Sequence, residues 1–139
     1  MPALRKNYVE TGKVRIVWHD FPWIGEESRV AAQAARCAGN QGKFWEYHDY
    51  LFAHQRGENQ GQFGKANLKN FGQQLGLESS AFGQCLEAGA DLDMLRSQVR
   101  TATSSGLRGT PSFKLNGQLL GAGTYEQFAR AIDQRLAGR

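Results

Sequence analysis

Residues 109–120 contain a strong hairpin signal and read Gly109-Thr110-Pro111-Ser112-Phe113-Lys114-Leu115-Asn116-Gly117-Gln118-Leu119-Leu120. Its Asn116-Gly117 step supplies the two residues that accept positive φ in a tight turn, which predicts a β-hairpin over 112–120. Thr124 and Gln127 then match the capping-box pattern and predict the start of a closing helix. The apolar stripe of that helix consists of Tyr125, Phe128, Ala129, Ile132 and Leu136.

Upstream of the hairpin, apolar residues recur at helical spacing and predict a block of five helices. Gly39, Gly76 and Gly106 are expected to end the first, third and fifth of them. Ser79 or Ser80 is expected to cap the fourth. The five apolar stripes are Val30, Ala31, Ala34, Cys37 and Ala38; Phe44, Tyr47, His48, Leu51 and Phe52; Leu68, Phe71, Gly72 and Leu75; Phe82, Cys85 and Leu86; and Leu92, Leu95, Val99 and Ala102.

The N-terminal region predicts one piece of helix and one strand. Residues 3–9 place Leu4 and Tyr8 on one helical face. Residues 13–18 alternate basic with apolar side chains and are rich in β-branched residues, so they predict a strand that Pro22 stops. The order is helix, strand, helical block, hairpin and helix, which predicts an α/β class with a small sheet.

The composition restricts the function classes. With 139 residues, of which 40% are hydrophobic and 22% charged, the chain is expected to form one globular domain. No apolar run approaches the roughly 20 residues that a transmembrane helix needs. The net charge of +4 is spread along the sequence, so nucleic-acid binding is not expected. His48 and His54 face different sides of one predicted helix, so no metal site is expected.

In their order and spacing, several segments resemble the DsbA-like branch of the thioredoxin superfamily, and the resemblance covers essentially the whole chain. It implies a thioredoxin-like fold over residues 1–139, with a thioredoxin part at 1–22 and 106–139 and an inserted helical subdomain at 23–105. Because that family catalyses thiol–disulfide exchange on other proteins, it also implies a protein thiol or disulfide as substrate and no cofactor. The matching segments are residues 8–15, 34–38, 42–49, 109–113, 116–117 and 125–128.

The segment Gly109-Thr110-Pro111 resembles the cis-proline loop of this superfamily. The resemblance implies a cis Thr110–Pro111 bond, although an arbitrary X-Pro bond is cis in only about 5–6% of cases. Since proline has no N–H group, such a loop leaves neighbouring backbone groups free to pair with an extended peptide. Gly109, Thr110 and Pro111 are therefore the candidate peptide-binding residues. A plain turn before a strand is the alternative.

The sequence departs from the family at its catalytic motif. Its first residues resemble the middle of the family's first helix, and neither the first strand nor the C-x-x-C motif is present. We therefore expect a fold that lacks the first strand and the start of the first helix, with no catalytic residue and no disulfide turnover. The unpaired sheet edges would favour a homodimer. Met1 is expected to be an internal methionine of a longer protein; a short protein that has lost its redox centre is the alternative.

Cys37 and Cys85 are the two cysteines of the sequence. Several extracytoplasmic members of the family carry a disulfide across the helical subdomain, and the resemblance implies a structural disulfide for this pair. Closing a loop of about 48 residues would stabilise the fold by roughly 4 kcal/mol. Two buried free thiols are the alternative. Met1 leads into no signal peptide, but disulfide chemistry implies an extracytoplasmic site for the intact protein.

Two other functions remain open. A non-catalytic module could bind extended peptides through Thr110 and Pro111. A glutathione-linked transferase or isomerase of the kappa-like branch would share the fold. That branch usually has an aromatic-Gly step before its last helix, whereas this sequence has Gly121-Ala122-Gly123-Thr124-Tyr125.

Overall fold

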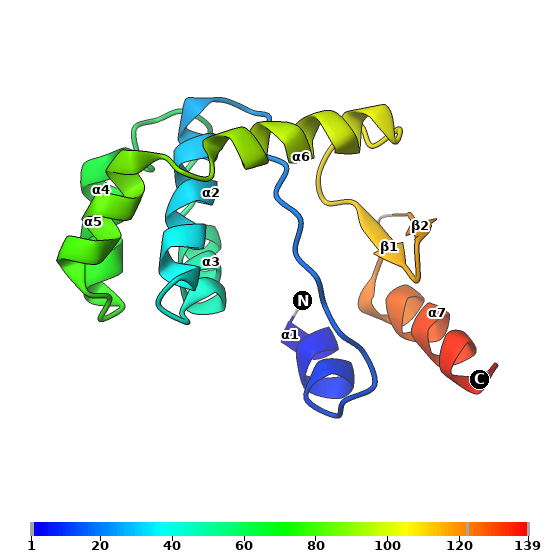
Figure 1. Ribbon diagram of the computed structural model, residues 1–139. Helices are drawn as coiled ribbons and strands as arrows, with labels where there is room; N and C mark the ends of the chain where they lie inside the picture. Colours follow the sequence, from blue (N-terminus) through cyan, green and yellow to red (C-terminus); the bar gives the residue numbers. More distant parts are fainter. Residues whose placement is uncertain (1, 122, 139) are drawn as a thin grey trace. The chain divides into compact units, whose positions relative to one another are not determined.

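The computed structural model describes residues 2–121 and 123–138 (Figure 1). The chain forms two compact units. Asp20–Gly106 is the helical unit, and the residues up to His19 together with those from Leu107 onward are the hairpin unit. The helical unit is thus one continuous stretch, whereas the hairpin unit is assembled from both ends of the chain.

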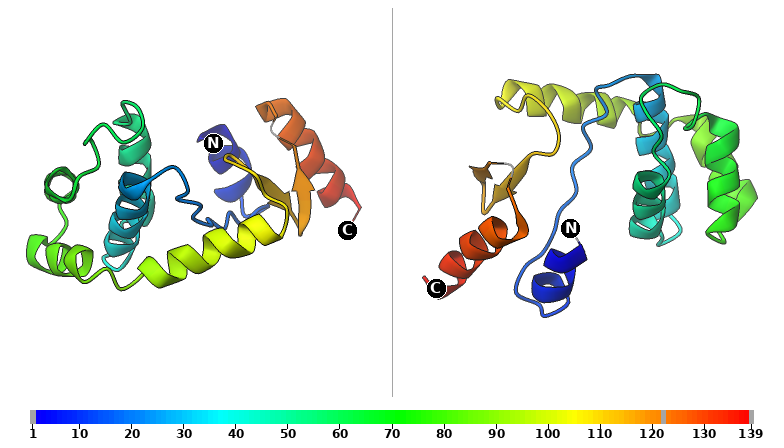
Figure 2. Two further views of the ribbon diagram at one scale, coloured as in Figure 1. Left: turned by 90° about the horizontal axis from the view of Figure 1, so that it is seen from above. Right: turned by 180° about the vertical axis from the view of Figure 1, so that it is seen from behind.

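The helical unit consists of helices (Figures 1 and 2). These helices bury a shared apolar core. The predicted five helices are all present: α2 (Glu26–Gly39), α3 (Phe44–Ala53), α4 (Lys65–Gln74), α5 (Ser79–Ala88) and α6 (Leu92–Ser104). Helix α2 is central, because it contacts each of the other four. The buried core comprises Ala31, Ala34, Ala35, Cys37, Ala38, Tyr47, Leu51, Leu68, Phe71, Leu77, Phe82 and Leu86.

Two features fix the packing of the helical core. A Cβ atom at Gly72 would lie 3.1 Å from the Phe82 ring and 3.3 Å from Leu77, so α4 and α5 approach closely only because residue 72 has no side chain. The Tyr47 hydroxyl is buried and donates a hydrogen bond to the backbone oxygen of Leu68 at 2.7 Å. Burial raises the pKa of Tyr47 well above its ordinary value.

The start of helix α5 differs from the prediction. Ser79 is the first residue of the helix, and Glu78 is its N-cap. The Glu78 carboxylate accepts hydrogen bonds from the backbone N–H groups of Ser80 at 2.8 Å and Ala81 at 2.6 Å. These bonds lower the pKa of Glu78. The prediction of a serine cap was therefore wrong. Serine is the commoner residue at the N-cap position, but here the longer side chain of Glu78 reaches the same N–H groups.

The hairpin unit contains a two-stranded antiparallel sheet. Strands β1 (Phe113–Leu115) and β2 (Gln118–Leu120) pair with Phe113 opposite Leu120 and Leu115 opposite Gln118. The turn residues Asn116 and Gly117 have φ values of 51° and 85°, as the Asn-Gly step predicted. Helix α7 (Tyr125–Ala137) begins with the predicted capping box of Thr124 and Gln127.

The N-terminal helix packs on α7. Helix α1 (Pro2–Leu4) continues into a π-helix, η1 (Arg5–Val9). The Tyr8 hydroxyl donates to Asp133 Oδ1 at 3.0 Å, and Asn7 Nδ2 donates to the Tyr125 hydroxyl at 2.6 Å. Burial and the Asp133 carboxylate raise the pKa of Tyr8. None of the described helices combines the length and apolar character required to cross a bilayer.

The strand predicted at residues 13–18 is wrong, because this segment is coil. Its side chains still alternate: Val14 and Ile16 are half-buried, whereas Arg15 and Val17 are exposed. A strand also needs a neighbour to form a ladder. Among residues 2–121 and 123–138, no backbone hydrogen bond reaches residues 15–17. The local pattern is therefore that of a strand, and the pairing partner is missing from the described chain.

Candidate functional site

The loop that precedes β1 presents the predicted peptide-binding residues. The Thr110–Pro111 peptide bond is cis. Thr110 and Pro111 are exposed, and Gly109 is half-buried. The hydroxyl of Ser112 donates to the backbone oxygen of Gly109 at 2.6 Å, which closes the loop on itself. The loop thus offers backbone groups to the solvent at the end of a strand.

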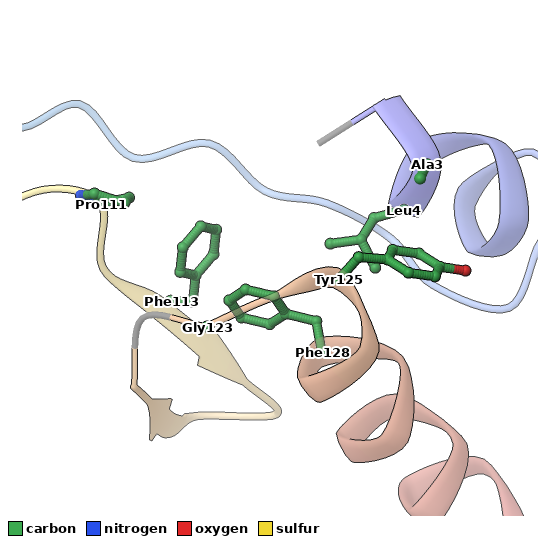
Figure 3. Close-up of a pocket in the computed structure, with 7 residues that line it drawn as sticks. All are labelled: Ala3, Leu4, Pro111, Phe113, Gly123, Tyr125 and Phe128. Atoms are coloured by element: carbon green, nitrogen blue, oxygen red, sulfur yellow. The ribbon is translucent and has the colours of Figure 1, made fainter.

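An apolar pocket of about 230 Å³ adjoins this loop. The side chains of Leu4, Phe113 and Phe128 point toward the same space, and Pro111 stands at its rim (Figure 3). The rings of Phe113 and Phe128 meet edge to face, with centroids 4.7 Å apart. The complete lining is Ala3, Leu4, Pro111, Phe113, Gly123, Tyr125 and Phe128.

The secondary structure determines how this pocket forms. Phe113 lies at the start of β1, and Tyr125 and Phe128 lie three residues apart on the first turns of α7. Leu4 comes from the other end of the chain, on α1. The hydrogen bond from Asn7 to the Tyr125 hydroxyl holds that ring at the pocket wall. The pocket itself was not predicted: Tyr125 and Phe128 were assigned only to the apolar stripe of the closing helix, and Phe113 only to the hairpin.

The two cysteines lie in the helical unit, where they form a disulfide between α2 and α5 (S–S 2.05 Å). Cys37 is 1% exposed, and Cys85 is half-buried. Gln33 Nε2 lies 3.5 Å from the Cys37 sulfur, and Asn40 Nδ2 lies 3.6 Å from the Cys85 sulfur. Both cysteines of the sequence take part in this disulfide, and neither is a free thiol.

The histidines are not arranged as metal ligands. His48 Nδ1 lies 2.9 Å from Asp49 Oδ1, and its ring is tilted against those of Phe44 and Phe52, with centroids 6.1 and 4.7 Å away. The ring of His54 stacks on Tyr50 with centroids 3.8 Å apart. Throughout the described part of the chain, no group of three or more His, Cys, Asp or Glu side chains could hold a metal ion.

Sequence comparison identifies proteins that resemble this chain. A protein-family model described as "Thioredoxin" matches residues 1–134. A protein-disulfide oxidoreductase of Rickettsia typhi is 28% identical over 97% of the chain, and a disulfide bond formation protein D of Bacillus anthracis is 24% identical over 98% of it. A Na(+)/H(+) antiporter of Salinispora arenicola is 33% identical over 99% of the chain.

These relatives are longer than the region that they share with this chain. The chain covers 21% of the Salinispora arenicola antiporter, 50% of the Rickettsia typhi protein and 64% of the Bacillus anthracis protein. Among solved structures, oxidised BdbD from Bacillus subtilis superposes with a TM-score of 0.80 at 18% identity, over 99% of this chain and 76% of that one. This superposition establishes a thioredoxin-like fold.

Proposed function

Because this chain belongs to the thioredoxin family, among its DsbA-like members, we propose that it is the substrate-binding part of a thiol–disulfide oxidoreductase that acts on protein disulfides. In this proposal Gly109, Thr110 and Pro111 hold an extended segment of the substrate protein. The apolar pocket beside Pro111 receives one of its side chains.

The observation that carries this proposal is the position of an exposed cis-proline loop beside an apolar pocket. Pro111 belongs to both. A backbone that lacks an N–H group at the proline cannot fold back into a regular ladder there, so Thr110 keeps its backbone groups available for an incoming peptide. Small ligand sites of this kind pair an apolar wall with a few backbone groups that orient the ligand.

In the same proposal the chain alone does not turn over disulfides. Thiol–disulfide exchange begins with a thiolate, and both cysteines of the sequence are joined to each other. Reduction of insulin by dithiothreitol should therefore proceed at the same rate with and without the chain. Turnover that disappears in Cys37→Ser or Cys85→Ser would contradict this assignment.

Peptide binding gives the direct test. We would titrate a fluorescent decapeptide with a central S-methylcysteine and apolar neighbours into the chain and follow its anisotropy. Pro111→Ala restores an N–H group and removes the proline ring from the pocket wall, so it should weaken binding at least about tenfold. Leu119→Ala is the matched control, since Leu119 is 60% exposed on β2. The proposal would be wrong if Pro111→Ala and the parent chain bound the peptide with equal affinity while circular dichroism showed that both are folded.

A non-catalytic peptide-binding module is the second candidate, and the disulfide between Cys37 and Cys85 favours it, because it leaves no thiol in the sequence for exchange. The two candidates differ in their response to an added redox partner. If insulin reduction stays uncatalysed when a separate C-x-x-C peptide is supplied, while the decapeptide still binds, the module is the better description.

A further inference from the structure

The disulfide of the helical unit exposes its two sulfur atoms unequally. Cys37 is 1% exposed and belongs to the apolar core around α2. Cys85 is half-buried, and the side chain of exposed Asn40 lies against it, with Nδ2 3.6 Å from Cys85 Sγ. Solvent that surrounds the Asn40 amide is therefore next to Cys85 Sγ, whereas Cys37 Sγ is enclosed by protein.

This difference determines which sulfur an external thiolate can attack. In thiol–disulfide exchange the incoming thiolate forms a bond to one sulfur, and the electrons of the S–S bond move to the other. The attacking sulfur approaches along the S–S axis, from the side opposite the leaving sulfur. An attack on Cys85 comes from the side away from buried Cys37, whereas an attack on Cys37 would have to come through the core. The disulfide is therefore open to thiols at Cys85 Sγ.

The Gln33 amide is the polar group beside the buried sulfur. Gln33 lies one turn before Cys37 on α2 and is also 1% exposed. Its Nε2 lies 3.5 Å from Cys37 Sγ. The same nitrogen lies 3.5 Å from the backbone oxygen of Cys85 and 3.4 Å from Asp91 Oδ2. These contacts hold the amide against the disulfide.

The oxygen of this amide lacks a hydrogen-bond donor in the oxidised chain. Gln33 Oε1 is buried, and no group of the described residues donates to it. A buried acceptor without a donor destabilises the state that contains it, and such an atom beside a disulfide points to a redox role. A disulfide has no hydrogen to donate. A Cys37 thiol has one, on the sulfur that already faces this amide, so reduction supplies the missing donor.

We propose that the Cys37–Cys85 disulfide is a reversible modification site for small aliphatic thiols such as glutathione, which attack Cys85 Sγ, and that Gln33 favours the reduced form. The thiolate forms a bond to Cys85 Sγ as the bond between Cys85 and Cys37 breaks. Cys37 Sγ leaves with the electron pair, takes a proton from solvent and donates a hydrogen bond to Gln33 Oε1.

The product of this step is a mixed disulfide between Cys85 and the small thiol. A second small thiolate that attacks the outer sulfur of this mixed disulfide releases Cys85 as a thiolate and leaves as part of a small-molecule disulfide. The chain is then reduced by two electrons, and two small thiols are oxidised. The reverse reaction restores the disulfide of the chain.

This site is separate from the cis-proline loop. The disulfide lies in the helical unit, whereas Thr110 and Pro111 lie in the hairpin unit. Because Cys85 is only partly exposed, its partner is a small thiol rather than a cysteine of a folded protein. The proposal thus concerns modification of the chain itself and not turnover of protein disulfides, and it does not depend on the function proposed for the loop.

Single-cysteine variants test the difference in access. Cys37→Ala leaves Cys85 as a free thiol, and Cys85→Ala leaves Cys37. With oxidised glutathione, Cys37→Ala should form the mixed disulfide at least about tenfold faster than Cys85→Ala, as measured by the mass of the intact chain. In concentrated urea both thiols are accessible, so the two rates should agree within about twofold. This control also identifies a variant that is already unfolded in buffer.

The parent chain provides a second measurement that needs no variant. It is incubated with excess reduced glutathione, quenched with acid and digested for mass spectrometry. Glutathione should be found on the peptide that contains Cys85 at least about tenfold more often than on the peptide that contains Cys37. This measurement tests the point of attack even if a single-cysteine variant does not fold.

Redox titration tests the role of Gln33. In mixtures of reduced and oxidised glutathione, alkylation and mass spectrometry give the fraction of chains with a closed disulfide. Gln33→Met keeps a side chain of similar length without the amide, so it should raise the equilibrium constant for disulfide formation at least about fivefold. Gln84→Met is the matched control, because Gln84 is an exposed glutamine next to Cys85 on α5; the constant should stay within about twofold. A purely structural effect would destabilise the oxidised and reduced chains alike and leave this constant unchanged.

Several outcomes would overturn the proposal. Equal rates for the two folded single-cysteine variants, or glutathione found mainly on Cys37 of the parent chain, would place the attack elsewhere. A disulfide that excess reduced glutathione leaves closed would exclude the modification. An equilibrium constant that Gln33→Met does not raise, or that Gln84→Met raises equally, would remove Gln33 from it. None of these measurements involves peptide binding at Pro111, so the two proposals can fail independently.

Discussion

Gly72 lets helices α4 and α5 pack closely, because it has no side chain at their contact. Helix propensity alone would favour alanine there by about 1 kcal/mol. A Cβ atom, however, would lie 3.1 Å from the Phe82 ring, which is fully buried and cannot move aside. We expect Gly72→Ala to destabilise the fold by about 1–3 kcal/mol, as overpacking of a core does. Urea denaturation monitored by circular dichroism measures this.

Gly83 provides the matched control, because it also lies inside a helix, on α5. The nearest atom to a Cβ there would be Lys69 Cε at 3.8 Å, on a flexible side chain. Gly83→Ala should therefore stabilise the fold by about 0.5–1 kcal/mol. If both variants shift stability in the same direction, the close contact at Gly72 is not the deciding factor.

Glu87 is the residue whose charge links stability to pH. Hydrogen bonds from Lys65 and then Lys69, at 2.7 and 2.8 Å, lower the pKa of Glu87 to about 2. A carboxyl group with a lowered pKa in the folded state stabilises above its ordinary pKa and loses this contribution as the pH falls through the folded value. The difference in Tm between the parent and Glu87→Gln should be constant above about pH 5.5 and vanish near pH 2.

The surroundings of Glu87 suggest the control for this pH experiment. The side chains of Glu87, Lys65 and Lys69 are all exposed. The difference in Tm between the parent and Glu87→Gln should therefore be small and should decrease in 1 M salt. Glu46→Gln changes an exposed glutamate on α3 outside this network. If the Tm difference of Glu87→Gln stays unchanged at pH 2, the two lysines are not its source. The same conclusion holds if Glu46→Gln gives the same Tm difference.

At the scale of elements, the disulfide joins α2 to α5 across 48 residues. In the chain-entropy description, closing such a loop stabilises by roughly 4 kcal/mol, because it restricts the unfolded chain. The double variant Cys37→Ala, Cys85→Ala should be less stable by about that amount in urea denaturation. Dithiothreitol should destabilise the parent similarly and leave the double variant unchanged. A parent chain that is insensitive to reduction under conditions where alkylation finds both thiols would contradict this expectation.

The helices and the hairpin could be predicted from the sequence because their determinants are local. The stripe of Ala31, Ala34 and Ala38 has the 3.6-residue period that a helix requires, and Asn116-Gly117 accepts the two positive φ values of its turn. The strand expected at 13–18 depended on a neighbour far away in the sequence. Alternating side chains show which faces a segment can bury, but they do not supply the hydrogen-bonding partner that makes it a strand.

The candidate site could be predicted in part, for the same reason. Gly109, Thr110 and Pro111 form a short motif, so the resemblance could mark them. The pocket depends on Leu4 meeting Phe113 and Phe128, which are more than 100 residues away in the sequence. No local pattern joins these residues, since each one also fits an ordinary apolar stripe.

At the scale of the whole molecule, the helical unit contains its own core and its own covalent link. Asp20–Gly106 is continuous, and it also carries the ion pair of Arg36 with buried Asp20 at 2.6 Å. We expect residues 20–106 alone to fold with helical circular dichroism, a cooperative thermal transition and the Cys37–Cys85 disulfide intact. A matched fragment of residues 26–104, which lacks Asp20, should be less stable. An unfolded 20–106 fragment would show that the unit needs the rest of the chain.

The two parts of the hairpin unit are synthesised at different times, because the whole helical unit lies between them in the sequence. Tyr8 is synthesised before the helical unit, yet the carboxylate that accepts the hydrogen bond of its hydroxyl belongs to Asp133. At about 5–20 residues per second, the first segment waits roughly 6–25 s for its partner. During that interval the helical unit between them can complete its core, while Leu4 still lacks Phe113 and Phe128, with which it lines the pocket. During synthesis Tyr8 therefore waits longer for its hydrogen-bond partner than Asp20 of the helical unit waits for Gln98, which is 78 residues away.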